Sequence, residues 1–261
     1  MKLFAGPCVL EQDSASALSI ARQLVKLREQ GVEVTFKGSF DKANRTRLGS
    51  FRGPGLVRGL AVLEQVKRET GLEVTTDIHE AGQAESVATV ASVIQIPALL
   101  SRQTDLITAA AKTGRAVNIK KGQFMSPDDV CWAVEKARQG GAAEVYVTER
   151  GVMFGYNNLV VDPRSLVRLL ELGRREAFEV IFDGSHSIQT PSANQGCSGG
   201  ERRMIAPLCR AAVAIGVENL FLETWPDSPD QAPCDGPIAF ELEEIAPLMC
   251  ELQQIAHVIR S

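Results

Sequence analysis

Residues 72–120 read LEVTTDIHEAGQAESVATVASVIQIPALLSRQTDLITAAAKTGRAVNIK. Three short apolar runs in this stretch contain several β-branched residues, at 73–77, 92–96 and 116–120. Helical patterns separate them at 80–89 and 103–113. Strand-length runs that alternate with helix-length segments are typical of βα units in a parallel sheet. The stretch therefore predicts consecutive βα units.

The same alternation continues in both directions, without a linker or a low-complexity segment. It predicts further strands at 2–5, 32–37, 144–148, 178–183 and 218–223, and further helices at 14–30, 56–70, 127–140, 163–174, 200–215 and 238–259. Eight βα units in 261 residues fit a closed parallel barrel better than an open sheet, and no GxGxxG follows the first strand. We therefore expect an α/β protein with one (β/α)8 (TIM) barrel domain over residues 1–261.

Composition and charge narrow the functional classes. The net charge is −4, and no Lys/Arg cluster is interleaved with aromatic residues, which argues against a nucleic-acid surface. No apolar run approaches the roughly 20 residues that span a bilayer. The N-terminus lacks the pattern of a signal peptide, and the six cysteines show no CxxC spacing. We expect a cytoplasmic protein with mostly reduced thiols and no membrane or nucleic-acid partner.

Basic residues follow several predicted strands, which is unusual in a chain that is acidic overall. They are Lys37, Lys42, Arg45, Lys121 and Arg150. In a parallel barrel the carboxyl ends of all strands meet at one mouth, where active sites lie. Any one such cation can be a solvated surface charge, but five from several loops indicate a ligand that carries phosphates or carboxylates.

A second set of residues offers metal ligands. It comprises Cys8, His186, Glu223 and Asp235, which follow the first, seventh and eighth predicted strands. A thiolate, an imidazole and two carboxylates suit a divalent transition ion such as Fe, Zn or Mn. Each residue also has an ordinary explanation, as buried filler, a hydrogen-bonded histidine or a loop carboxylate. The residues alone leave the metal open.

Ten motifs carry a resemblance that runs almost from end to end. They are AGPCVLE, FKGSFDKANR, FRGPGL, TDIHE, QIPALLSRQTDL, VNIKKGQF, TERGVMFGYNNLVVD, FDGSHSIQ, SGGERR and CDGP. With these motifs the chain resembles the 3-deoxy-D-manno-octulosonate 8-phosphate synthase family. The resemblance implies a transferase that condenses phosphoenolpyruvate with D-arabinose 5-phosphate and water. The products would be the eight-carbon acid sugar phosphate, used for bacterial lipopolysaccharide, and phosphate.

The resemblance also implies roles for individual residues. Phosphoenolpyruvate would be held by Lys37, Lys42, Gln95, Lys121 and Arg150, and the sugar phosphate by Ser39, Asn44 and Arg45, with Asp77 also in contact with substrate. Arg102 would reach the sugar phosphate of an adjacent subunit, which implies a homo-oligomer, usually a tetramer. We expect catalytic roles for Lys37, Lys42, Lys121, His186 and Asp235.

The family contains a metal-dependent class with Cys at the position of Cys8 and a metal-free class with Asn there. Cys8 therefore implies a divalent ion (Fe, Zn, Mn or Co) held by Cys8, His186, Glu223 and Asp235.

The chain departs from the family pattern after the eighth predicted strand, where it reads Thr224-Trp225-Pro226-Asp227 and then Ser228-Pro229. This loop flanks the expected site. Two alternatives therefore stay open: a related synthase that uses another aldose phosphate, such as erythrose 4-phosphate, and a non-catalytic paralogue that binds sugar phosphates. The KANR motif disfavours the first, and the intact Lys121, Arg150 and His186 argue against the second.

Overall fold

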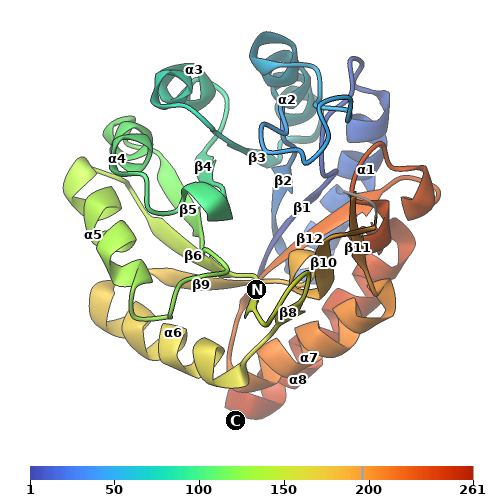
Figure 1. Ribbon diagram of the computed structural model, residues 1–261. Helices are drawn as coiled ribbons and strands as arrows, with labels where there is room; N and C mark the ends of the chain where they lie inside the picture. The colour runs from blue at the N-terminus through green and yellow to red at the C-terminus, as the bar shows by residue number, and fades with distance from the viewer. Residues whose placement is uncertain (195–196, 261) are drawn as a thin grey trace.

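The computed structural model describes residues 1–194 and 197–260 and shows a closed barrel of parallel strands (Figure 1). The barrel strands are β1 (Lys2–Gly6), β2 (Glu33–Lys37), β3 (Glu73–Asp77), β4 (Val93–Ile96), β5 (Ala116–Lys120), β6 (Val145–Glu149), β9 (Glu179–Asp183) and β12 (Asn219–Trp225). They pair in this order, and β12 closes the ring by pairing with β1, with Phe221 beside Phe4. The predicted (β/α)8 barrel is confirmed.

Helices cover the outside of the barrel (Figure 1). They are α1 (Ala15–Val25), α2 (Leu56–Thr70), α3 (Ala84–Ala88), α4 (Thr104–Lys112), α5 (Val130–Gly140), α6 (Pro163–Glu176), α7 (Ile205–Ile215) and α8 (Ile245–Arg260). Gly31, Gly71, Gly141 and Gly216 end helical segments in the left-handed conformation, as C-terminal stops do. In the described part of the chain, no helix is long and apolar enough to cross a membrane.

The structure differs from the sequence prediction mainly in the loops at the barrel mouth. Two hairpins, β7–β8 (Val152–Met153 with Leu159–Val160) and β10–β11 (Gln189–Asn194 with Cys197–Gly200), were not predicted. The last helix begins at Ile245 rather than 238, and β13 (Phe240–Glu241) comes before it. Pro247 explains the late start, because proline is tolerated in the first turn of a helix but not in its interior.

Side chains alternate between the inside and the outside of the barrel along each strand. In β5, Ala116 belongs to the apolar cluster inside the barrel, whereas Val117 and Ile119 belong to the larger core under the helices. The inner cluster consists of Phe4, Val93, Ala116, Tyr146, Ile181 and Phe221. Because side chains repeat with a period of two, residues two and four positions further along a strand also face inward. The inner face becomes polar towards the mouth, where Thr148 Oγ1 donates to Asn118 Oδ1 (2.7 Å).

Candidate active site

A cavity of about 640 Å³ lies at the carboxyl ends of the strands. Ten of the residues that the sequence predicted for the site line it: Lys37, Lys42, Asn44, Arg45, Asp77, Gln95, Arg150, His186, Glu223 and Asp235. They come from six of the eight barrel strands or from the loops that follow them. The barrel thus brings distant parts of the chain to one mouth, as its topology predicts.

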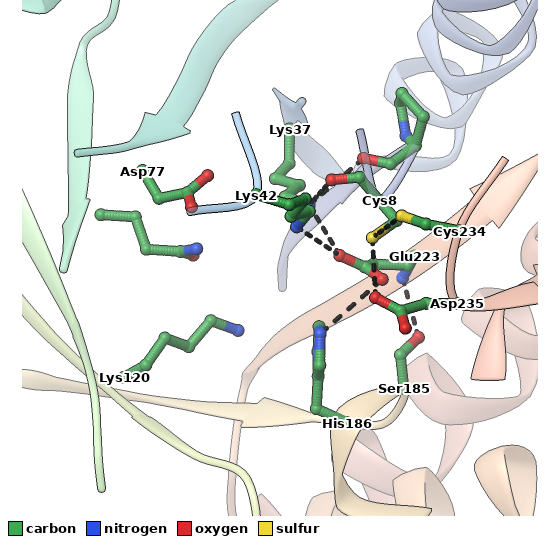
Figure 2. Close-up of polar contacts among 12 residues, drawn as sticks. Cys8, Lys37, Lys42, Asp77, Lys120, Ser185, His186, Glu223, Cys234 and Asp235 are labelled. Atoms are coloured by element: carbon green, nitrogen blue, oxygen red, sulfur yellow. Dashed lines mark hydrogen bonds and ion pairs between the residues drawn. The ribbon is translucent and has the colours of Figure 1, made fainter. Parts of the chain in front are cut away.

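Sulfur and carboxylate groups meet at one wall of this cavity (Figure 2). Cys8 Sγ donates to Asp235 Oδ2 (2.9 Å), and Cys234 Sγ lies 2.6 Å from Cys8 Sγ. His186 Nε2 lies 3.7 Å from Glu223 Oε2. The possible ligand atoms of Cys8, Cys234 and Asp235 lie within 4.8 Å of one another, and so do those of His186, Glu223 and Asp235. Asp235 joins the two groups.

The chemistry of these donors fits a divalent transition ion. Glu223 is fully buried, and its Oε2 atom has no hydrogen-bond partner within residues 1–194 and 197–260. Burial, Cys234 and the Asp235 carboxylate raise the pKa of the Cys8 thiol well above its ordinary value. A bound cation would reverse this effect, because a thiol that coordinates a metal binds as the thiolate and releases its proton to solvent. Thiolate, imidazole and carboxylate together suit Zn, Fe or Co.

Lys37 holds Glu223 and the loop after β1 in place. Its Nζ donates to Glu223 Oε1 (2.6 Å) and to the carbonyl oxygens of Cys8 (2.7 Å) and Pro7 (3.2 Å). Both partners of the ion pair are almost wholly buried. Although burial opposes ionisation of Glu223, the charges of Lys37 and His186 lower its pKa far below the usual range. Glu223 is therefore a carboxylate near neutral pH.

Asp183 orients His186. Asp183 Oδ1 accepts the backbone N–H of His186 (2.8 Å), and Oδ2 lies 2.8 Å from His186 Nδ1. Burial opposes ionisation of Asp183, but the charges of His186 and Lys120 lower its pKa well below the usual value. When the imidazole is neutral and its Nδ1–H donates to this carboxylate, the Nε2 lone pair is free, which is the usual arrangement behind a metal-binding histidine.

Lys120 is a buried lysine at the carboxyl end of β5. Its Nζ donates to Asp183 Oδ2 (2.6 Å) and lies 3.1 Å from the centroid of the Phe221 ring. Burial lowers the pKa of Lys120 to about 8, while Asp183 acts in the opposite direction. Lys120 also lines the cavity. It therefore offers a positive charge to an anionic ligand in surroundings that exclude most water.

Two arginines have donors without partners in the cavity wall. Arg45 lies 3.6 Å from Asp235, yet its buried Nε and Nη2 atoms have no hydrogen-bond partner in the described ranges. Arg150 donates to Gln189 Oε1 (2.8 Å) through Nη2, and its buried Nη1 has no such partner there either. Buried guanidinium donors without partners are costly unless a ligand satisfies them. The pattern fits an anionic ligand.

Four predicted residues, Cys8 among them, do not line the cavity, and the other three lie away from the site. Lys121 points to the other side of its strand, where its Nζ donates to Met125 O (3.1 Å) and lies 3.5 Å from Glu149. Ser39 is buried behind the wall, and its hydroxyl has no partner among the described residues. Arg102 is exposed and lines a separate hollow with Phe124 and Trp132. Within one chain the structure brings none of the three to the site. Cys8 also lies behind the wall, but it contacts Asp235.

Sequence reasoning gave no role to three residues that the structure brings to the site: Lys120, Asp183 and Cys234. The signal for Lys120 was available, because Ala116, Asn118 and Lys120 share one face of a strand while Lys121 lies on the other. Asp183 stands at the end of a predicted strand three residues before His186. For Cys234, the only signal in the sequence was its position next to Asp235, a predicted metal ligand.

Several known proteins are similar to this chain over nearly its whole length. The family model described as "DAHP synthetase I family" matches residues 1–261. A protein of Nitratidesulfovibrio vulgaris (strain DP4) is 52% identical, over 97% of this chain and 91% of its own length. Proteins of Syntrophotalea carbinolica (49% identical, 99% and 91% covered) and Campylobacter jejuni subsp. doylei (48%, 99% and 99%) are also similar. All three are named 2-dehydro-3-deoxyphosphooctonate aldolase.

The match therefore covers the barrel and every loop that contributes to the cavity. With the family model matched over residues 1–261 and relatives about half identical over nearly the whole length, the chain belongs to the DAHP synthetase I family of enzymes.

Proposed function

We propose that the protein condenses phosphoenolpyruvate with D-arabinose 5-phosphate and water to give 3-deoxy-D-manno-octulosonate 8-phosphate and phosphate. The observation that carries the proposal is that buried cations and a cluster of metal donors line one cavity. Relatives that share about half of the sequence are named for this eight-carbon acid sugar phosphate. The lipopolysaccharide pathway is the expected context.

The cations would place two anions side by side. Lys120 and Arg150 lie at the ends of β5 and β6 and would hold phosphoenolpyruvate, while Arg45 and Asn44 would hold the phosphate of the sugar. Lys42 lines the cavity with them, 3.9 Å from Glu223. Fixed positive charges offset the repulsion between the two substrates and align their reacting carbons.

In the reaction, carbon 3 of phosphoenolpyruvate forms a bond to the aldehyde carbon, whose oxygen takes up a proton. Water adds to carbon 2, and the resulting hemiketal phosphate expels phosphate by cleavage of its C–O bond. Lys42 stays protonated beside the site. Burial alone would lower its pKa, but the neighbouring Cys8, Glu223 and Asp77 groups outweigh this effect and raise the pKa well above its ordinary value. It is therefore placed to donate a hydrogen bond to the aldehyde oxygen as negative charge develops there.

Cys8, His186, Glu223 and Asp235 would hold the divalent ion. Once bound, the ion would supply Lewis-acid polarisation of an oxygen atom. Asp183 keeps the His186 ring in position, and Lys37 keeps Glu223 in position. These contacts set the orientation of the donors before any ligand binds.

The substrate is tested by incubating the metal-loaded protein with phosphoenolpyruvate and each aldose phosphate, and measuring released phosphate. We expect release with arabinose 5-phosphate and at least about 100-fold lower kcat/KM with erythrose 4-phosphate. A preference for erythrose 4-phosphate would instead identify the seven-carbon synthase. Absence of release with any aldose phosphate would identify a binding protein and contradict the proposal.

The pKa of Lys120 predicts a pH dependence. Lysine is cationic below its pKa, and burial lowers this pKa to about 8. Because phosphoenolpyruvate needs the cation, kcat/KM for phosphoenolpyruvate should fall about tenfold per pH unit above that value. Measurement of kcat/KM against pH for wild type and Lys120→Arg checks this. The alkaline limb should move to higher pH in the arginine variant, and an identical limb in both proteins would contradict the assignment.

Arg45 should govern binding of the sugar phosphate. Replacement of Arg45 by alanine removes two unpartnered buried donors, so KM for the sugar phosphate should rise about 10- to 100-fold with a smaller change in KM for phosphoenolpyruvate. Steady-state kinetics with each substrate varied will measure both. Arg52→Ala is the matched control, because Arg52 is an exposed arginine that pairs with Asp41. An equal effect of both variants would count against the role.

We also propose that the protein works as a cytoplasmic homotetramer. The support is the place of Arg102: it is exposed beside the exposed side chains of Phe124 and Trp132, away from the cavity of its own chain. In an assembly, this surface of one subunit would bring Arg102 to the sugar phosphate of another. Light scattering should give the mass of four chains, and a monomeric mass for the active enzyme would contradict this arrangement.

A further inference from the structure

We propose that Cys234 is an additional ligand of the divalent ion, so that the ion is held by two thiolates, from Cys8 and Cys234. This second sulfur would make the site prefer thiophilic ions such as zinc, cobalt and cadmium over manganese and magnesium, which favour oxygen ligands. The inference rests on the metal site of the proposed function.

The position of the Cys234 sulfur supports this role. Its Sγ lies 2.6 Å from Cys8 Sγ, and the thiol belongs to the donor group with Cys8 and Asp235 (Figure 2). Two Zn–S bonds of about 2.3 Å at a tetrahedral angle place their sulfurs roughly 3.7 Å apart. If the two side chains move slightly apart, one ion therefore fits between their sulfur atoms. Cys234 also lines the cavity, from which an ion can enter.

The backbone turns two successive side chains towards the same point. Asp235 has φ +54°, in the left-handed region that residues other than glycine rarely adopt. Its carbonyl accepts from the N–H groups of Ile238 (3.0 Å) and Ala239 (3.1 Å), which fixes the turn. At the next residue, Gly236, an added Cβ would lie 2.7 Å from Pro229 O. In a regular strand, neighbouring side chains point to opposite faces, so this conformation is what places both Cys234 and Asp235 in the site.

Local charge favours an ion with two thiolates. Arg45 lies beside Asp235 at 3.6 Å, and Lys37 pairs with Glu223 at 2.6 Å, so part of the negative charge is offset by the protein. The buried Cys209 provides a contrast, because it lies in the apolar core under the helices. Cys234 is half-buried among polar groups and has no such packing role.

A disulfide between Cys8 and Cys234 is the competing state of the same two sulfurs. Its S–S bond is about 2.05 Å long, and its formation needs an oxidant that removes two electrons and both thiol protons. In the protein purified under reducing conditions we expect Cys8 and Cys234 both to be free thiols. Thiol alkylation followed by mass spectrometry of the two peptides will show this. A stable disulfide under those conditions would overturn the proposal.

Cobalt spectroscopy tests the ligand directly. The full-length protein is stripped with a chelator and loaded with Co²⁺, whose sulfur-to-metal absorption in the near ultraviolet grows with the number of Co–S bonds. We expect Cys234→Ser and Cys8→Ser each to lose about half of this absorption per bound cobalt, and the double variant to lose nearly all of it. Cys250→Ser, which removes an exposed thiol outside the site, should match wild type. Undiminished absorption in Cys234→Ser would overturn the proposal.

A second measurement needs no variant. X-ray absorption of the zinc-loaded wild-type protein should report two sulfur neighbours at about 2.3 Å. One sulfur would overturn the role of Cys234 while leaving the four-ligand site intact. Neither experiment depends on turnover, so the inference and the proposed reaction can fail separately.

Discussion

Replacement of Lys120 by methionine should lower kcat/KM for phosphoenolpyruvate by about 10³-fold. Loss of one preorganised group that stabilises charge in the transition state typically slows an enzyme by about this factor. Lys120 is buried, donates to Asp183 at 2.6 Å and lines the cavity. Methionine keeps the length and the apolar contacts of the side chain but removes the charge. The measurement is steady-state kinetics on protein whose folding has been checked by circular dichroism.

Lys121→Met is the matched control for this experiment. The two lysines are adjacent and equally buried, but Lys121 pairs with Glu149 outside the cavity. Loss of a buried pair costs about 3 kcal/mol of folding stability or more, so a lower denaturation midpoint is expected. The kcat/KM of the folded protein should stay within about threefold of wild type. If Lys121→Met loses activity and Lys120→Met keeps it, the placement of the two side chains is wrong.

Glu223→Gln should remove both the metal and the activity. The change keeps the shape of the side chain but replaces a buried carboxylate, whose pKa Lys37 and His186 hold low against the effect of burial. An amide is a poor ligand for a transition ion and leaves Lys37 as an unpaired buried charge. We expect well under one equivalent of metal by elemental analysis after dialysis and a fall in kcat of about 10³-fold.

Glu241→Gln serves as the control, because Glu241 pairs with Arg202 outside the cavity. It should bind metal and turn over like wild type. Full activity of Glu223→Gln, or of chelator-stripped wild type with no detectable metal, would contradict a metal-dependent reaction.

The alternation of strand-length and helix-length patterns was sufficient to predict the barrel. Each βα unit has its own local pattern, so the prediction did not require the register between neighbouring strands. The periodicity within a strand also distinguishes the two adjacent lysines at the end of β5. Lys120 follows Ala116 and Asn118 on the inner face, so the alternation of side chains distinguishes it from Lys121. The motif VNIKKGQF by itself does not, since it presents both lysines at the end of one strand.

Other features depend on contacts that no local pattern encodes. Cys8 and Cys234 meet only because β1 pairs with β12 and the loop after β12 folds back, with β13 pairing beyond the barrel. The left-handed backbone at Asp235 is likewise invisible in the sequence, because most residues with positive φ are glycines. Arg102 cannot be assigned from one chain, since its proposed ligand would lie in another subunit.

Metal and phosphoenolpyruvate should share the cavity at the carboxyl ends of the strands. Anomalous X-ray diffraction from crystals soaked with Co²⁺ and phosphoenolpyruvate will show whether they do. We expect an anomalous peak within bonding distance of Cys8, His186, Glu223 and Asp235, with the phosphate of phosphoenolpyruvate against Lys120 and Arg150. A peak elsewhere, or phosphoenolpyruvate bound outside this cavity, would contradict it.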